Sequence, residues 1–138
     1  MSHRIEWRHD GRRILVPVAI LAPYPSTDLA GIDGMALLDT GSTTSGVSER
    51  IARKLSLPKR GKRPIASIQG EGQAERFQFR VGIRAEANEP SFPYVFDELT
   101  GFGLTEAFAF EALLGMDVLG QCDFDMDRHG WCAIEFGR

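Results

Sequence analysis

Apolar and polar positions alternate along much of the chain in the short runs that are typical of β-strands. Residues 14–21 form an apolar run that contains Pro17, which indicates a buried strand at a sheet edge or a bulge. A second short buried strand is predicted at residues 35–38, directly after a turn-rich segment at residues 31–34. In residues 77–83 every second side chain is apolar, which predicts a strand with one buried face.

A glycine-rich hairpin is predicted near the middle of the chain. Gly70 and Gly72 can adopt the positive φ angles that hairpin turns require, so the turn is placed at residues 69–72. Residues 65–68 are apolar enough to form the strand that enters this turn. We therefore expect residues 65–83 to form one hairpin with a glycine-rich tip.

The remaining segments predict shorter elements. We expect strands at residues 94–96, 123–126 and 131–136, a loop at residues 101–103, and either strand or helix at residues 107–110. A turn at residues 127–130 joins the last two strands into a closing hairpin. The final strand is expected to expose Trp, Ile and Phe side chains that a partner could cover. His3 and His9 lie in a charged N-terminal segment that we expect to be solvated.

Residues 48–55 carry the helical pattern of this sequence. Val47, Ile51 and Leu55 recur at every fourth position and therefore share one face. Ser48 is suited to cap the first turn, and Pro58 ends the helix. The 15 glycines and 7 prolines favour short strands and many turns over long helices in the rest of the chain.

Length and charge limit the classes of function. The 138 residues suffice for one domain, residues 1–138, and the net charge of −3 argues against a dedicated nucleic-acid binder. Residues 1–69 carry 11 basic and 6 acidic side chains, a net charge of +5, whereas residues 70–138 carry 5 and 13, a net charge of −8. The basic cluster comprises Arg50, Arg53, Lys54, Lys59, Arg60, Lys62 and Arg63. We interpret it as a solvated face, with a patch for an acidic partner as the alternative.

The longest apolar run, residues 14–22, is too short to span a bilayer, which needs about 20 residues. Arginines before this run would fit a signal peptide, but Glu6, Asp10 and Pro23 argue against one. We therefore expect a cytoplasmic protein with no membrane partner.

Cys122 and Cys132 are too few for a disulfide scaffold and are expected to be free thiols. With His129 they do not match the usual spacing of zinc ligands. Asp123, Asp125 and Asp127 alternate along one strand and are expected to form a solvated face. The sequence therefore predicts neither a metal nor a cofactor.

The candidate chemistry lies at Asp39-Thr40-Gly41-Ser42, which follows the apolar strand at residues 35–38 directly. A carboxylate at the end of a buried strand is costly unless hydrogen bonds compensate for lost solvation. Gly41 allows the backbone to bend close enough to supply them. Taken alone, this tetrapeptide is an Asp that caps its own turn.

The order of the motifs resembles the retropepsin family, the aspartic proteases of retroviruses and retrotransposons and their cellular relatives. The resemblance is carried by Ala36-Leu37-Leu38-Asp39-Thr40-Gly41-Ser42, the glycine-rich hairpin and Leu113-Leu114-Gly115-Met116-Asp117-Val118-Leu119, and covers about residues 13–136. Viral members often carry an Arg at position 116 that pairs with an acidic residue at position 43. Met116 and Thr43 replace both partners here.

The resemblance implies an all-β, retropepsin-like half-barrel with one short helix, which forms a two-fold homodimer. It implies an aspartic endopeptidase acting on a peptide or protein substrate, in which Asp39 from each subunit forms a dyad that activates water. The implied roles are loop support by Thr40, Gly41 and Ser42, a flap at Gln69, Gly70, Glu71 and Gly72, substrate pockets at Leu37 and Leu113, and structural support by Gly115 and Asp117. If the Ser42 hydroxyl donates to Asp39, the acid limb of activity extends to lower pH.

Two other functions remain open at this point. The first is a non-catalytic dimer of the same fold that binds peptides or assists assembly. The second is a small β-barrel that binds an acidic ligand through residues 50–63, which would be a monomer whose binding weakens with salt. An intact Asp39-Thr40-Gly41 favours the protease, because a binding module has no need of a carboxylate dyad.

Overall fold

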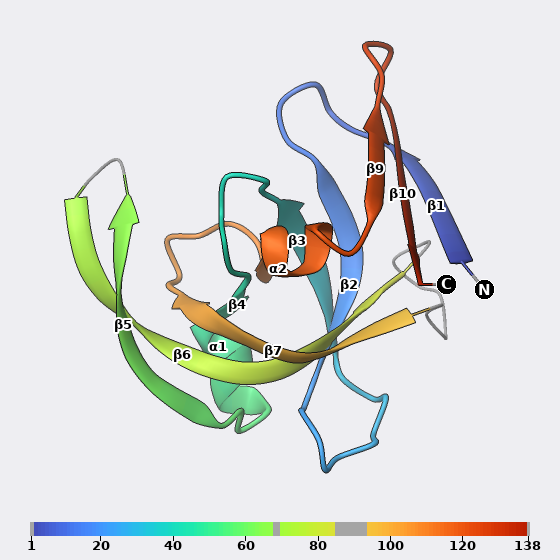
Figure 1. Cartoon of the computed structure of the whole chain (residues 1–138). Helices are drawn as coiled ribbons and strands as arrows, with labels where there is room; N and C mark the ends of the chain where they lie inside the picture. Colours follow the sequence, from blue (N-terminus) through green and yellow to red (C-terminus); the bar gives the residue numbers. More distant parts are fainter. Residues whose placement is uncertain (1, 68–69, 85–93, 138) are drawn as a thin grey trace.

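The computed structural model of the chain describes residues 2–67, 70–84 and 94–137 (Figure 1). Within these residues the strands are β1 (Ser2–Arg8), β2 (Leu15–Leu21), β3 (Ile32–Leu38), β4 (Gly46–Ser48), β5 (Lys59–Ser67), β6 (Gly70–Ile83), β7 (Tyr94–Leu104), β8 (Ala112–Leu114), β9 (Asp123–Met126) and β10 (Trp131–Gly137), and the helices are α1 (Glu49–Lys54) and α2 (Met116–Leu119). The mainly β architecture predicted from the sequence is confirmed, with two short helices in place of one.

The larger sheet contains seven strands in the order β2-β3-β8-β4-β7-β6-β5, and β2 also pairs with β6. This second pairing closes the sheet on itself and places β5 at its edge. The strand predicted at residues 77–83 is confirmed, and Phe77, Phe79, Val81 and Ile83 are buried. Burial of each such side chain stabilises the fold by about 1.5–3 kcal/mol. The expected exposed face is wrong at Arg80 and Gly82, which are buried as well, and the Arg80 guanidinium donates to the carbonyl oxygens of Ala22 at 2.6 Å and Asp28 at 2.8 Å.

Pro17 lies where β2 tolerates a missing backbone donor. β2 pairs with β3 along its length, but its pairing with β6 begins only at Val18. Pro17 therefore sits at the edge portion of β2, and the predicted edge position is confirmed.

Two glycine-containing segments that were expected to be turn or loop lie inside strands instead. β3 already begins at Ile32, and a Cβ at Gly34 would lie 2.5 Å from the side chain of Glu111. β7 continues through residues 101–103, where a Cβ at Gly101 would lie 2.4 Å from the Ser45 carbonyl oxygen. These glycines serve close packing between elements rather than chain reversal. Residues 107–110 are neither strand nor helix.

α1 forms where the sequence predicts it. The Ser48 hydroxyl caps the helix by accepting a hydrogen bond from the Ile51 N–H at 3.4 Å, and Ile51 lies in the core. All seven side chains of the basic cluster are exposed, as expected for a solvated face.

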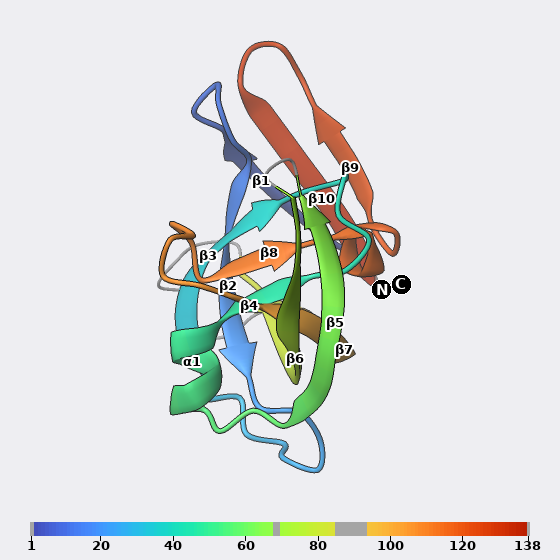
Figure 2. The same ribbon diagram turned by 90° about the vertical axis from the view of Figure 1, so that its left-hand side faces the viewer.

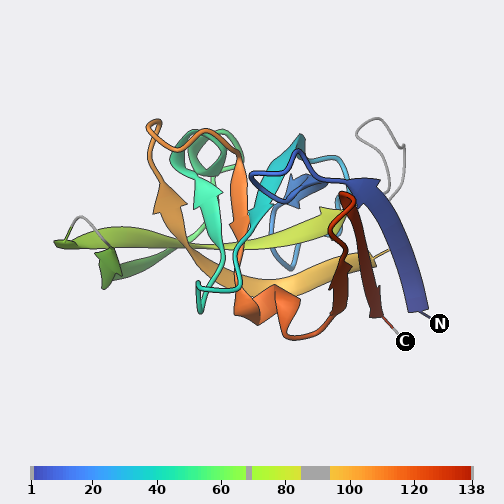
Figure 3. The same cartoon turned by 90° about the horizontal axis from the view of Figure 1, so that it is seen from above.

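The hairpin of β5 and β6 is also confirmed, but its turn is displaced from the predicted position. Ser67 pairs with Gly70, Ala66 with Glu71 and Ile65 with Gly72, so the last three of the four residues expected in the turn belong to β6. Gln69, the first of them, lies outside the described residues. The hairpin extends well away from the rest of the sheet (Figure 3).

A separate three-stranded sheet has the order β1-β10-β9, so β10 is covered on both edges within the chain. The N-terminal segment was expected to be solvated, but it forms β1, with Ile5 buried in the core. The closing hairpin of β9 and β10 is confirmed. The expectation that the last strand exposes Trp, Ile and Phe is correct for Trp131 only, because Ile134 and Phe136 are buried. No helix in the described part of the chain is long and apolar enough to cross a membrane.

Candidate active site

Asp39 lies at the meeting point of three strands. β8 runs between β3 and β4, parallel to the first and antiparallel to the second (Figure 2). The Asp39 loop, residues 39–45, connects β3 to β4 across the end of β8. Its start is fixed because the Asp39 N–H donates to the Leu114 carbonyl oxygen at 3.0 Å. The topology of the sheet therefore determines where this carboxylate is placed.

The carboxylate of Asp39 is oriented by its own turn. The Gly41 N–H donates to Asp39 Oδ1 at 2.9 Å, and the Ser42 N–H donates to the Asp39 carbonyl oxygen at 3.2 Å. A Cβ at Gly41 would lie 3.2 Å from that same Oδ1, which is tighter than ordinary contact. Asp39 is partly exposed, and Thr40 and Gly41 are exposed. The Asp39 loop therefore lies at the surface of a single chain, with its carboxylate partly exposed.

The Ser42 hydroxyl does not donate to Asp39. It donates to the Thr44 carbonyl oxygen at 2.7 Å, and a hydroxyl has only one hydrogen to donate. The expectation that this hydroxyl stabilises ionised Asp39 is wrong, and the shift of the acid limb derived from it no longer follows. Ser42 instead tightens the Asp39 loop from within.

Two residues, buried Ser45 and half-buried Asp117, tie the Asp39 loop to α2. Asp117 Oδ1 accepts from the Ser45 hydroxyl at 2.7 Å, and Oδ2 accepts from the Ser45 N–H at 3.0 Å. The Ser45 hydroxyl in turn accepts from the Gly115 N–H at 3.1 Å. Ser45 is fully buried, and sequence reasoning missed it. Its only signal is a small polar residue directly before the apolar Gly46-Val47.

Main-chain contacts complete this connection. The Met116 N–H donates to the Ser42 carbonyl oxygen at 2.8 Å, and the Asp117 N–H donates to that of Thr43 at 3.2 Å. A Cβ at Gly115 would lie 2.6 Å from the Thr44 carbonyl oxygen, so the approach requires glycine here. Residues 42 and 43 are thus held to residues 116 and 117 through the backbone.

The other predicted site residues are distributed around this centre. Leu37 and Leu113 are register partners on β3 and β8, with Leu37 partly exposed and Leu113 buried. Gly70, Glu71 and Gly72 lie on β6 near the end of the hairpin, which rises on the same side of the molecule as the Asp39 loop (Figure 1). The structure therefore brings Ser42, Gly115 and Asp117 together at the Asp39 loop. The β5–β6 hairpin is not part of this cluster.

Carboxylates elsewhere have structural roles. Asp127 accepts hydrogen bonds from the N–H groups of Trp131 at 3.0 Å and His129 at 2.8 Å. These bonds, chiefly the one from Trp131, hold the pKa of Asp127 below its usual value. Asp127 therefore caps the turn between β9 and β10. Within the described residues, no group of three or more His, Cys, Asp or Glu side chains is arranged to hold a metal ion.

Cys122 is expected to be a poor nucleophile. Burial, with a smaller effect of Asp123, raises the pKa of its thiol to about 11, so the thiolate fraction near pH 8 falls about a hundredfold. Higher basicity recovers part of the lost rate, and we expect alkylation at least about tenfold slower than for N-acetylcysteine. Iodoacetamide labelling followed by mass spectrometry of the Cys122 peptide measures this, and equal rates would show that the thiol is accessible and ionised.

No protein-family model matches the chain, and no curated protein matches it either. Among solved structures, the chain is similar to the crystal structure of a retropepsin-like aspartic protease from Rickettsia conorii, with a TM-score of 0.64. The two share 17% sequence identity, and the match covers 99% of this chain and 94% of that one. The likeness extends over nearly the whole of both chains and shows that this protein has the retropepsin-like fold.

Proposed function

We propose that this protein is an aspartic endopeptidase, active as a homodimer in which Asp39 of each subunit forms a catalytic dyad. The observation that carries the proposal is the position of Asp39. It directly follows β3 of a retropepsin-like sheet, accepts a hydrogen bond from the Gly41 N–H, and is partly exposed in a single chain. A single carboxyl group cannot be ionised, to take a proton from water, and protonated, to donate to the carbonyl oxygen, at the same moment, so a second copy completes the site.

The chemistry follows from two carboxylates at contact distance. Both cannot be ionised together, so the dyad holds one shared proton. The ionised Asp39 accepts a proton from a water molecule, whose oxygen attacks the peptide carbonyl carbon. The protonated Asp39 donates a hydrogen bond to the carbonyl oxygen, and a proton then passes to the leaving nitrogen as the C–N bond breaks. Ser45 and Asp117 hold the Asp39 loop in place, and in the dimer Thr40 would contact the opposite loop.

Exposed apolar side chains support a dimer. Met116, Met126 and Trp131 are 44%, 57% and 49% exposed. Met126 and Trp131 flank the turn of the β9–β10 hairpin, which rises on the same side as the Asp39 loop and the β5–β6 hairpin (Figure 1). A partner on this side would cover these side chains and face Asp39 at once. Because β10 is paired on both edges, the partner must use the edge of β1 or β9, or a face.

Activity is therefore expected to follow the dimer fraction. Sedimentation velocity and hydrolysis of a quenched-fluorescence peptide library are measured over the same range of protein concentration. Specific activity should fall as dilution produces monomers, because each monomer holds half of the dyad. Full specific activity in a strictly monomeric sample would contradict the proposal. A dimer with no hydrolysis of any peptide would identify a non-catalytic peptide-binding module.

A further inference from the structure

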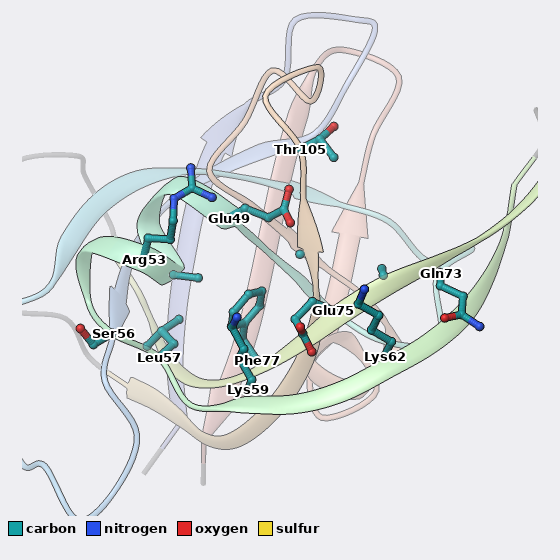
Figure 4. A pocket seen from close by; sticks show the side chains of 13 residues that line it. Glu49, Arg53, Ser56, Leu57, Lys59, Lys62, Gln73, Glu75, Phe77 and Thr105 are labelled. Atoms are coloured by element: carbon teal, nitrogen blue, oxygen red, sulfur yellow. The ribbon is translucent and has the colours of Figure 1, made fainter.

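A hollow in the surface lies away from Asp39, between α1 and the β5–β6 hairpin. This α1–hairpin groove has a volume of about 550 Å³ (Figure 4). Its base consists of the buried apolar residues Ala52, Leu57 and Phe77. A volume of this size is typical of ligand sites, and an apolar base with polar walls is the usual composition of such sites.

Three cations of the basic cluster line the groove. Arg53 extends from α1, and Lys59 and Lys62 extend from β5 (Figure 4). All three are exposed, and among the described residues none of them forms an ion pair. Lys62 lies opposite Glu75 in the register of β5 and β6, yet the two are not in ion-pair contact. The positive charge of the groove is therefore available to an anionic ligand.

The lining favours an acidic peptide over a nucleic acid. Glu49 and Glu75 also line the groove, so a phosphate chain with a charge on every unit would meet repulsion there. An extended peptide can place its carboxylates near the three cations and neutral residues near the two glutamates. Phe77, the aromatic residue of the lining, is only 6% exposed and offers no platform on which a base could stack.

The groove and the expected flap belong to the same hairpin. Residues 59 and 62 of β5 and residues 73–75 and 77 of β6 contribute to the lining of the groove. The hairpin formed by these two strands also carries the segment expected to act as the flap. An extended substrate that lies along this hairpin reaches the groove with residues some distance from the cleaved bond. We propose that the α1–hairpin groove binds an acidic segment of the protein substrate that flanks the cleaved bond, an inference that rests on the proposed function.

The binding test does not require hydrolysis. A ¹⁵N-labelled Asp39→Asn chain is titrated with an octaglutamate peptide, and amide shifts are expected in α1, at Lys59 and Lys62, and along the start of β6. The double variant Lys59→Glu/Lys62→Glu should weaken binding at least about tenfold, and raising salt from about 0.05 to about 0.5 M should weaken it as well. The control Arg12→Glu/Arg128→Glu makes the same change in net charge at two exposed positions outside the groove and should bind as tightly as the parent.

The remaining outcomes overturn the proposal. Equal binding of octaglutamine would show that charge is not recognised, and tighter binding of the oligonucleotide dT8 at the same face would assign it to nucleic acid. A changed sedimentation coefficient in the double variant would assign the groove to a contact between copies.

A kinetic test links the groove to hydrolysis. A cleavable peptide flanked by glutamates should have a lower KM than its glutamine counterpart, and this difference should disappear in the double variant. An unchanged KM would show that the groove does not bind the substrate. A complete absence of hydrolysis would instead count against the proposed catalytic role of Asp39.

Discussion

Replacement of Asp39 by Asn is expected to reduce peptide hydrolysis at least about a thousandfold while the fold and the dimer persist. The side-chain oxygen of the introduced asparagine can still accept the hydrogen bond from the Gly41 N–H, so the Asp39 loop keeps its shape. The amide cannot exchange a proton with water, so the dyad loses its base. The substitution also removes repulsion between paired carboxylates, and the melting temperature of the dimer should hold or rise. Initial rates and thermal unfolding of both proteins measure these effects.

A mixing experiment tests whether the two carboxylates act together. Equimolar wild-type and Asp39→Asn chains are allowed to exchange subunits, and activity is compared with that of wild type alone. If each site needs Asp39 from both subunits, only wild-type homodimers are active and activity falls to about a quarter. If each subunit works alone, half remains. The control variant Glu106→Gln changes an exposed carboxylate in the segment after β7 and should leave full activity at every ratio. Unchanged turnover in Asp39→Asn would end the protease proposal.

Local patterns in the sequence were sufficient for the elements whose burial is regular. In β6 every second side chain from Phe77 to Ile83 is apolar and lies in the core, and α1 carries its cap and its apolar stripe within a few residues. β1 was missed because its buried positions alternate with Arg4, Glu6 and Arg8, so the charges conceal a strand that β10 holds in place. Gly101 predicts a loop locally, but the glycine is needed because the Ser45 carbonyl oxygen approaches it from another element.

The candidate site likewise contains residues that the sequence reveals and residues that it does not. Asp39 and Asp117 stand out in the sequence because each belongs to a recognisable motif. Ser45 has only a weak local signal, since its importance comes from a contact with Asp117, 72 residues away. The direction of the Ser42 hydroxyl could not be predicted either, because Asp39 and the Thr44 carbonyl oxygen are both within reach of a loop this short. Long-range contacts and competing local acceptors are what sequence patterns leave undetermined.

The second large effect is expected at Asp117, which holds the Asp39 loop without approaching a substrate. Asp117→Ala removes the acceptor of two Ser45 groups and of the Val118 N–H, which donates to Oδ1 at 3.0 Å. Because Ser45 is fully buried, its N–H would be left without a partner, and we expect the free energy of unfolding to fall by about 3 kcal/mol. Urea unfolding measures the loss, and Asp125→Ala on β9 should change it by less than about 0.5 kcal/mol.

The variant Asp117→Asn shows whether stability depends on the charge and hydrogen bonds of this side chain or only on its volume. Whichever way the amide is turned, its NH₂ group faces a backbone donor, that of Ser45 in one orientation and that of Val118 in the other. This variant should therefore lose stability although its shape is nearly unchanged, and the amide protons of Ser45 and Gly115 should exchange faster. Hydrolysis should fall mainly through kcat, because a displaced Asp39 loop misplaces the dyad rather than the substrate. Wild-type stability and exchange in Asp117→Asn would show that the Asp39 loop holds its position without this carboxylate.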